Sequence, residues 1–148
     1  MSQDVGELLL RSVPFARTLG IVFETASDGR AVCRVPPRED FANHVGGPHA
    51  GVLFTLAESA SGAAVLSLFA DQLDRAVPLP ITATIAFRKI AMGEVRASAR
   101  LSASRDDVLA RLDAGERPEF DVEVEIMNAD GVVVSTLTVT WTLRPGRP

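Results

Sequence analysis

The sequence predicts an α+β domain in which an antiparallel sheet wraps around one long helix. Two observations lead to this fold class. The stretch from Gly51 to Ala70 contains no proline and is apolar on nearly every face, which is typical of a buried helix. Six further segments have the pattern of strands. A helix that is apolar on all sides must be covered on all sides, and a curved antiparallel sheet can cover it.

The other elements follow from local pattern and turn residues. A short helix is expected to end before Pro14, which cannot continue it. Asp28-Gly29 and Ala129-Asp130-Gly131 are typical hairpin turns and separate strand-like runs. In chain order, we expect a helix at 5–13, strands at 19–25 and 31–35, the long helix at 51–70, and strands at 81–90, 94–104, 120–128 and 132–143. Residues 144–148 are expected to fray.

Length and composition narrow the classes of protein. The 148 residues suit one domain with a real core, and we expect a single domain over residues 1–148. The net charge of -4 and the lack of a basic cluster argue against nucleic acid as a partner. Cys33, the single cysteine, is expected to be a small core residue on a strand and not a catalytic thiol. The apolar run at residues 8–10 is too short for a signal peptide, so the cytoplasm is the expected compartment.

A membrane span is the competing interpretation of the apolar helix, because about 20 apolar residues can cross a bilayer. Glu58 lies near its middle, and glutamates inside membranes are rare. The helix also contains Ser, Thr and Gly, and the rest of the chain has the pattern of a sheet. We therefore expect a buried core helix and no membrane partner.

The loop that opens this helix carries the most chemical information. Residues 43–51 read Asn-His-Val-Gly-Gly-Pro-His-Ala-Gly, and Glu58 follows two turns inside the helix. Glu58 is the only acid or base between Val52 and Ala70. Burial of an isolated ionised carboxylate is costly, so such residues are usually paired or functional.

This segment resembles the active-site segment of hotdog-fold acyl-CoA thioesterases, in particular those of the phenylacetate-degradation (PaaI-like) type. In that family an Asn in the loop is followed by His-Gly-Gly and then by an apolar helix that carries Asp or Glu. Here Asn43 is followed by His49-Ala50-Gly51, and Glu58 stands fifteen residues after Asn43. The resemblance implies a hotdog fold and hydrolysis of a CoA thioester to a free acid and CoA. Coenzyme A is then part of the substrate, and neither a separate cofactor nor a metal is expected.

The sequence departs from the family pattern in two places. Ala50 replaces the first Gly of the pair, which keeps the backbone N–H that the family directs at the thioester oxygen but adds a methyl group. The connection from Ser104 to Glu119 is longer than a tight turn, and residues 105–113 have the pattern of a short helix ending at Gly115. We expect a solvated excursion there, with a lid over the substrate as the alternative.

Thioester hydrolysis needs stabilisation of an oxyanion and an activated water or nucleophile. Unpaired N–H groups at a helix start suit the first task, and Ala50 and Gly51 stand there. Glu58 suits the second as a general base, because desolvation raises the pKa of a carboxyl group. Asn43 is a candidate for positioning the water or the thioester. His49 is more often a hydrogen-bonding residue at a helix start than a catalyst.

Helix geometry predicts more than one chain per site. Ala50 and Glu58 are eight residues apart, about 12 Å along a helix axis, which a glutamate side chain cannot span. A two-fold axis could bring Glu58 of one chain to the Ala50 N–H of another, so a homodimer or homotetramer is expected. Arg88 and Lys89 are candidates for binding CoA phosphates, with an exposed strand end as the alternative.

Two other functions remain open from the sequence. In hotdog dehydratases of fatty-acid synthesis a His precedes the catalytic Glu by fourteen residues, and His44 has this spacing from Glu58, although the Phe-Pro that follows the His there is missing here. The protein could therefore be a hydroxyacyl-thioester dehydratase. The second alternative is a non-catalytic protein that binds acyl thioesters.

Overall fold

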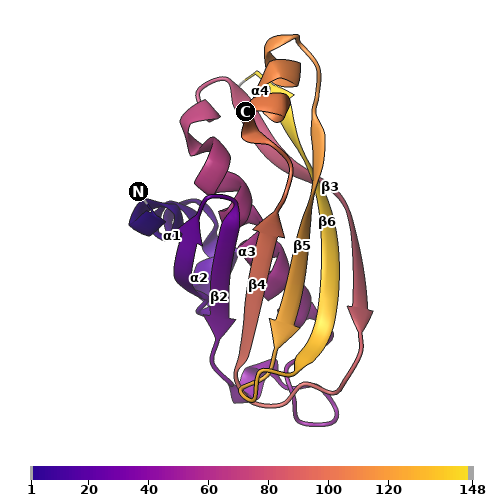
Figure 1. The fold of residues 1–148 in the computed structure, drawn as a ribbon. Helices are drawn as coiled ribbons and strands as arrows, with labels where there is room; N and C mark the ends of the chain where they lie inside the picture. Colours follow the sequence, from indigo (N-terminus) through magenta and orange to yellow (C-terminus); the bar gives the residue numbers. More distant parts are fainter. Residues whose placement is uncertain (1, 147–148) are drawn as a thin grey trace.

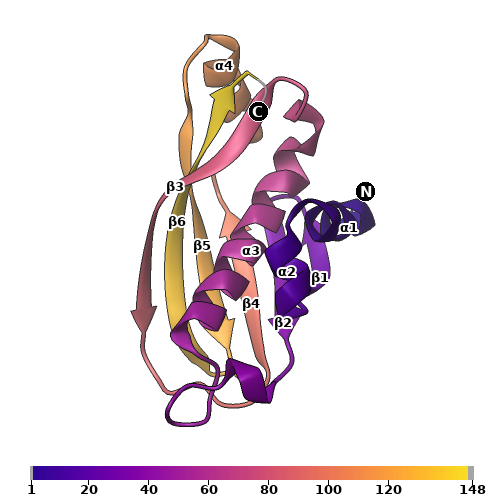
Figure 2. The same ribbon diagram turned by 180° about the vertical axis from the view of Figure 1, so that it is seen from behind.

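One antiparallel sheet curves around a central helix in the computed structural model, which describes residues 2–146, with side chains from Val5 onward (Figure 1). Helix α3 (Ala50–Phe69) lies against the inner face of the sheet (Figure 2). This hotdog arrangement confirms the predicted fold class. The strands are β1 (Val22–Ser27), β2 (Arg30–Val35), β3 (Ala76–Phe87), β4 (Val95–Leu101), β5 (Glu119–Met127) and β6 (Val133–Pro145), in the sheet order β1-β2-β4-β5-β6-β3.

Helix α3 forms the core because its residues are small or apolar on every face. It begins and ends within one residue of the predicted 51–70, and the short 3-10 helix η2 (Ala70–Gln72) extends it. The combined segment is long and apolar enough to cross a membrane by those two criteria alone. However, 67% of its most apolar stretch is buried in the domain, which identifies it as the core helix.

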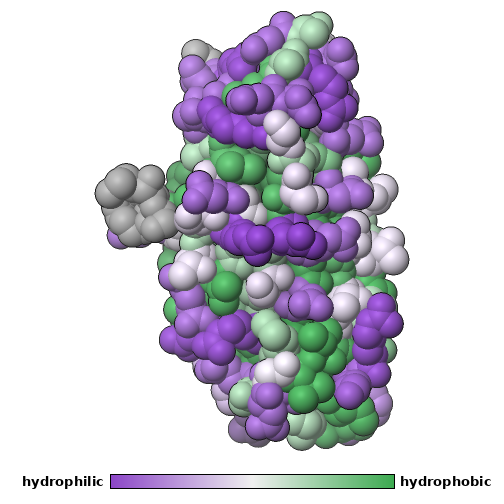
Figure 3. Space-filling view, in the orientation of Figure 1, coloured by the Kyte–Doolittle hydropathy of each residue, from purple (hydrophilic) through white to green (hydrophobic). Residues whose placement is uncertain are grey.

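Strict alternation of buried and exposed residues in β5 shows which face of the sheet is inner and which is outer. In β5 the apolar residues at 120, 122, 124 and 126 are buried under α3, and the acidic residues between them are exposed. On the outer face Thr138 and Thr140 of β6 donate hydrogen bonds to Glu123 and Asp121, at 2.8 and 2.6 Å. Figure 3 shows that hydrophilic residues cover the upper part and the middle of this face, whereas hydrophobic residues gather toward its lower end.

Two helices, and not one, precede the sheet: α1 (Ser2–Ser12) and α2 (Pro14–Leu19). The predicted strand at 19–25 was therefore wrong at its start, since β1 begins at Val22. Pro14 occupies the first turn of α2, and Gly20 ends it with a positive φ of 68°. Both are ordinary helix-boundary signals, which the apolar alternation after Leu19 obscured.

Strand β3 begins five residues earlier than the predicted 81–90 and ends at Phe87. Pro78 and Pro80 argue against a strand because proline cannot donate to a ladder. They are tolerated because β3 lies at the sheet edge and pairs only with β6, with an irregularity between Pro80 and Thr82. Strand β4 ends at Leu101, short of the predicted residue 104.

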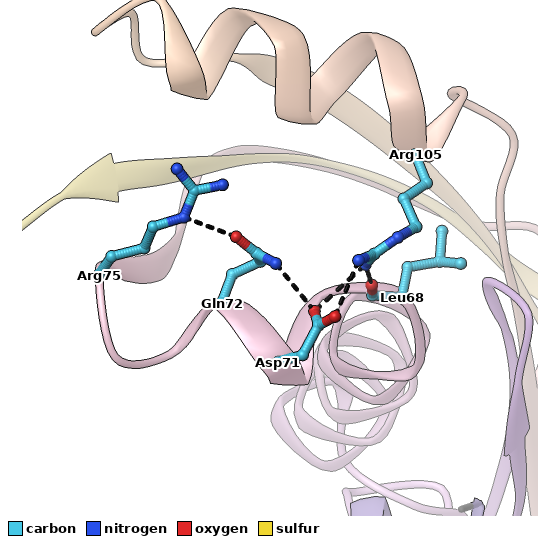
Figure 4. A network of polar contacts seen from close by, with 5 residues as sticks. All are labelled: Leu68, Asp71, Gln72, Arg75 and Arg105. Carbon is cyan, nitrogen blue, oxygen red and sulfur yellow. Dashed lines mark hydrogen bonds and ion pairs between the residues drawn. The ribbon is translucent and has the colours of Figure 1, made fainter.

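The insert between β4 and β5 forms α4 (Arg105–Asp113), as predicted. Arg105 donates to the carbonyl of Leu68 and pairs with Asp71 at 2.8 Å, which fastens α4 to the C-terminal end of α3 (Figure 4). Val108 and Leu112 are buried beneath it. The insert is thus anchored and not a solvated excursion. It also lies at the end of the sheet opposite to the loop before α3, so it is no lid over the predicted site (Figure 1).

The C-terminal strand is longer than predicted. Strand β6 continues through Pro145, and the Gly146 N–H donates to the Arg75 carbonyl at 2.8 Å. Residues 144–146 of the expected frayed tail are therefore held to the domain. Arg147 and Pro148 lie outside the described residues.

Candidate active site

The start of α3 is capped by His49. Its backbone is extended (φ -60°, ψ 149°), and its Nδ1 accepts a hydrogen bond from the Gly51 N–H at 2.8 Å. Its carbonyl accepts from the N–H groups of Val52 and Leu53. Among the described residues, no acceptor meets the Ala50 N–H. Of the two predicted oxyanion donors, only Ala50 therefore has an N–H that is open to a ligand, at the positive end of the helix dipole.

Asn43 shapes the loop that leads to this helix. Its Oδ1 accepts from the N–H groups of Val45 (3.0 Å) and Gly47 (3.2 Å), and its Nδ2 donates to the Pro48 carbonyl at 3.4 Å. Both ends of the amide are thus bonded within the loop. In this structure Asn43 fixes the path of the backbone into α3.

Gly47 fixes where the loop lies. A Cβ at this position would overlap the backbone carbonyl oxygen of Ala91 and come within 3.0 Å of the Met92 sulfur. Only glycine allows this close approach between the loop and the segment that follows β3. The loop therefore packs directly against Ala91 and Met92.

A cavity of about 420 Å³, here called the loop cavity, brings several predicted residues together. Asn43, His44, Ala50, Arg88 and Lys89 all lie on its wall, together with apolar residues of α3 and β3. The backbone N–H groups of Arg88 and Lys89 both donate to the carbonyl of Val134, and the Arg88 Nε donates to the Thr136 hydroxyl at 3.1 Å. The wall of the loop cavity therefore includes Ala50, the residue with the open N–H, and two cationic residues.

Glu58 lies on a different cavity, here called the Glu58 cavity, of about 570 Å³. This cavity lies beside α3 and is walled by residues of α1, α2, β3 and Trp141. Burial raises the pKa of the Glu58 carboxyl above its ordinary value of 4.5. No hydrogen bond or ion pair reaches this carboxylate from the described residues. It is therefore a desolvated acid without a partner, which suits a general base.

A short hydrogen-bonded chain fixes the helical turn that carries Glu58. The Trp141 Nε1–H donates to the Ser61 hydroxyl at 3.0 Å, and this hydroxyl donates to the Glu58 carbonyl at 2.7 Å. Both Ser61 and Trp141 are buried. Sequence reasoning missed Trp141 and the wall formed by α1 and α2. The strand-like segment around Trp141 was found, but the sequence does not show which helix residue its ring contacts.

The remaining predicted residues lie elsewhere. His49 and Gly51 line a third cavity, of about 510 Å³, between the start of α3 and Phe15 of α2. Cys33 is fully buried, and burial raises the pKa of its thiol, which agrees with a core residue. Among the residues that the structure describes, no group of three His, Cys, Asp or Glu side chains could hold a metal ion.

Comparison with known proteins places the chain in a family. The family profile described as "Domain of unknown function (DUF4442)" matches residues 3–143. The chain belongs to the DUF4442 family. No functionally curated protein matches this DUF4442 sequence.

Solved structures share the fold of this DUF4442 protein. A protein of unknown function from Pseudomonas aeruginosa, PA5026, described as a probable thioesterase, is 29% identical, with a TM-score of 0.84 over 97% of this chain and 95% of that chain. The PaaI protein of Escherichia coli, from the phenylacetic acid degradation operon, is 19% identical, with a TM-score of 0.77 over 98% and 94% of the two chains. A hypothetical thioesterase from Streptococcus pneumoniae, crystallised with coenzyme A, is 22% identical, with a TM-score of 0.67 over 86% and 88%.

Proposed function

We propose that this DUF4442 protein is an acyl-CoA thioesterase, which hydrolyses a CoA thioester to a free acid and CoA. The observation that carries the proposal is that α3 bears two groups suited to this reaction. They are the open N–H of Ala50 at its start and the desolvated Glu58 carboxyl within it, which has no hydrogen-bond partner among the described residues. The description of the 29% identical P. aeruginosa protein as a probable thioesterase supports it. No separate cofactor is needed, since coenzyme A is part of the substrate.

The proposed reaction assigns one task to each group. Glu58 accepts a proton from a water molecule, whose oxygen forms a bond to the thioester carbon. The carbonyl oxygen becomes an oxyanion, and the Ala50 N–H donates a hydrogen bond to it. The carbon–sulfur bond then breaks, the carboxylic acid forms, and the CoA sulfur takes the proton from Glu58. Asn43 and His49 keep the loop and the helix start in place.

The active unit is proposed to be a homodimer, or a homotetramer built from such dimers. Within one chain, Ala50 and Glu58 are about 12 Å apart along the helix axis and face separate cavities. A two-fold axis can join the loop cavity of one chain to the Glu58 cavity of another.

The edge of the sheet supports this assembly. Residues 81–84 of β3 are all exposed, so both faces of the strand and its outer edge are uncovered. A long open edge is usually paired or protected. Phe87 and Ile90, which follow along the same edge and line the loop cavity, are also exposed, at 53% and 71%. Pairing of β3 with a second β3 would cover these apolar side chains.

The loop cavity is proposed to receive the CoA part of the substrate. Arg88 and Lys89 stand on its wall, and their positive charges can pair with CoA phosphates. The Streptococcus pneumoniae relative was crystallised with coenzyme A, which supports a CoA site in this fold. We expect the protein to act in the cytoplasm, without nucleic acid or membrane as partners.

The decisive experiment incubates the purified protein with a panel of acyl-CoAs and a thiol reagent that reports released CoA. We expect thiol release with wild type and a loss of about a hundredfold in kcat for Glu58→Ala, the usual scale for a general base. Glu7→Ala, which removes an exposed acid of α1, is the matched control and should keep full activity. Equal turnover in wild type and Glu58→Ala would reject Glu58 as the base.

The same samples separate the two alternatives. A dehydratase that uses His44 and Glu58 would hydrate crotonyl-CoA with loss of the enoyl absorbance, and His44→Ala would abolish this reaction. His44 is exposed on the loop cavity, so its removal should leave the fold intact. A non-catalytic binding protein would bind acyl-CoA without thiol release or hydration.

A further inference from the structure

The Glu58 cavity is larger than catalysis at a carboxylate requires, and it is apolar. Its volume is about 570 Å³, and Glu58 is the only charged residue on its described wall. The other side chains around it include Leu8, Leu66 and Trp141, and only Ser12 and Ser59 add hydroxyl groups. An apolar cavity with one convergent polar group is typical of a site for an apolar ligand.

The direction of the substrate follows from the two cavities. The thioester carbon must lie within reach of Glu58 through one water molecule. The CoA part leaves that carbon on the sulfur side, toward the loop cavity of the second chain of the proposed dimer, which Arg88 and Lys89 line. The acyl carbons leave on the opposite side. Because Glu58 lies on the wall of its cavity, the acyl carbons enter that cavity.

The far end of the cavity limits the chain that it can hold. Leu8 of α1 and Leu66 of α3 line both the Glu58 cavity and a second cavity of about 740 Å³. The second cavity is lined on its other side by Asp28, Asp71 and Arg105, whose charges disfavour an apolar tail. The two leucines therefore form a partition, here called the leucine partition, between an apolar and a charged compartment.

We propose that the Glu58 cavity is the acyl site and that it selects apolar medium-chain acyl groups, of about eight to twelve carbons. This inference rests on the proposed thioesterase function and adds its substrate class. A methylene group takes about as much room as a water molecule, about 30 Å³, so such a chain needs about 240–360 Å³. This volume fits within the about 570 Å³ of the Glu58 cavity, with the tail of the chain directed toward the leucine partition. Helices α1 and α2 are then the specificity-determining wall of the site.

The test measures kcat/KM for straight-chain acyl-CoAs from two to sixteen carbons, together with phenylacetyl-CoA. For wild type we expect kcat/KM to rise by up to about fourfold per added methylene, the factor expected for burial of one methylene group, until about ten carbons. Acetyl-CoA and phenylacetyl-CoA should be poorer substrates than decanoyl-CoA.

Substitutions at Leu8 should move the optimum in opposite directions. Leu8→Trp fills the end of the cavity and should lower kcat/KM for decanoyl-CoA by about tenfold or more, with little change for butyryl-CoA. Leu8→Ala opens the leucine partition and should shift the optimum to longer chains. Arg11→Trp, at an exposed position of the same helix and on neither cavity wall, is the matched control and should keep the wild-type profile. Circular dichroism of each variant checks the fold.

The outcomes separate this inference from the proposed function. Three results would overturn the acyl site while thioesterase activity stands. They are equal kcat/KM for all chain lengths, a preference for acetyl or phenylacetyl groups, and an optimal chain length that neither Leu8 variant changes. If no acyl-CoA is hydrolysed, the proposed function fails. Calorimetry then tests the acyl site independently of hydrolysis. The acyl site is supported if decanoyl-CoA binds more tightly than CoA and if Leu8→Trp weakens this binding. It is rejected if decanoyl-CoA and CoA bind equally.

Discussion

Replacement of Ala50 by proline should remove the oxyanion donor without disturbing the helix. Ala50 is the first residue of α3, a position that favours proline because its N–H has no partner within the helix. The residue before it, His49, already has the extended backbone that must precede proline (φ -60°, ψ 149°). The cap between His49 and Gly51 uses the next N–H along the chain and remains intact. The helix start therefore loses one open N–H and gains the carbons of the proline ring in its place.

The expected loss follows from the number of donors. One open backbone N–H faces the loop cavity at this helix start, so the variant loses the contribution of one oxyanion donor, about 2.7–4 kcal/mol or a factor of about 10²–10³ in kcat. The assay is thiol release from the best acyl-CoA at saturating substrate, with thermal unfolding to confirm the fold. Ala50→Gly keeps the N–H and should retain kcat. A folded Ala50→Pro protein with undiminished kcat would refute the assignment of the oxyanion donor.

Three further predictions concern the loop, the acid and the core. Gly47→Ala should lower kcat by about a hundredfold, because the new Cβ overlaps the Ala91 carbonyl and must displace the loop by about 1 Å. A folded Gly47→Ala protein with the wild-type kcat would contradict this. Burial raises the pKa of the Glu58 carboxyl above its ordinary value of 4.5. The contribution of this group to the stability of the fold is therefore fully present below pH 4.5, where the carboxyl is protonated, and is lost as the pH rises through the raised pKa. Glu58→Gln should therefore increase the free energy of unfolding at pH 7 but not at pH 4, which chemical denaturation at the two pH values measures. The wild-type kcat should rise with pH through the same range, which a pH–rate profile measures. Ser135 has a buried hydroxyl without a partner among the described residues, so Ser135→Ala should stabilise the fold by about 1 kcal/mol, and a clear loss of stability in urea unfolding would show that the hydroxyl is paired.

The sequence alone determined the core helix, five of the six strands to within about three residues at each end, and the α4 insert. These elements carry strong local signals: a proline-free apolar run, strict alternation as in β5, and Gly or Asp-Gly at the turns. Local patterns failed where tertiary context overrode them. The edge position of β3 allows Pro78 and Pro80 within a strand, and the short helix α2 was hidden by the apolar alternation that follows it.

The tertiary structure decided how the candidate residues divide between sites. The sequence placed Asn43, His49, Ala50 and Glu58 in one motif, but spacing along a chain does not state which cavity each residue faces. The fold puts Asn43 and Ala50 beside Arg88 and Lys89, because Gly47 lets the loop pack against residue 91, and it puts Glu58 under α1 and α2. Part of the apolar wall around Glu58 comes from segments more than 40 residues away in sequence, such as Leu8 before it and Trp141 after it. Long-range packing of this kind leaves no local pattern, which is why the acid could be found in the sequence while its cavity could not.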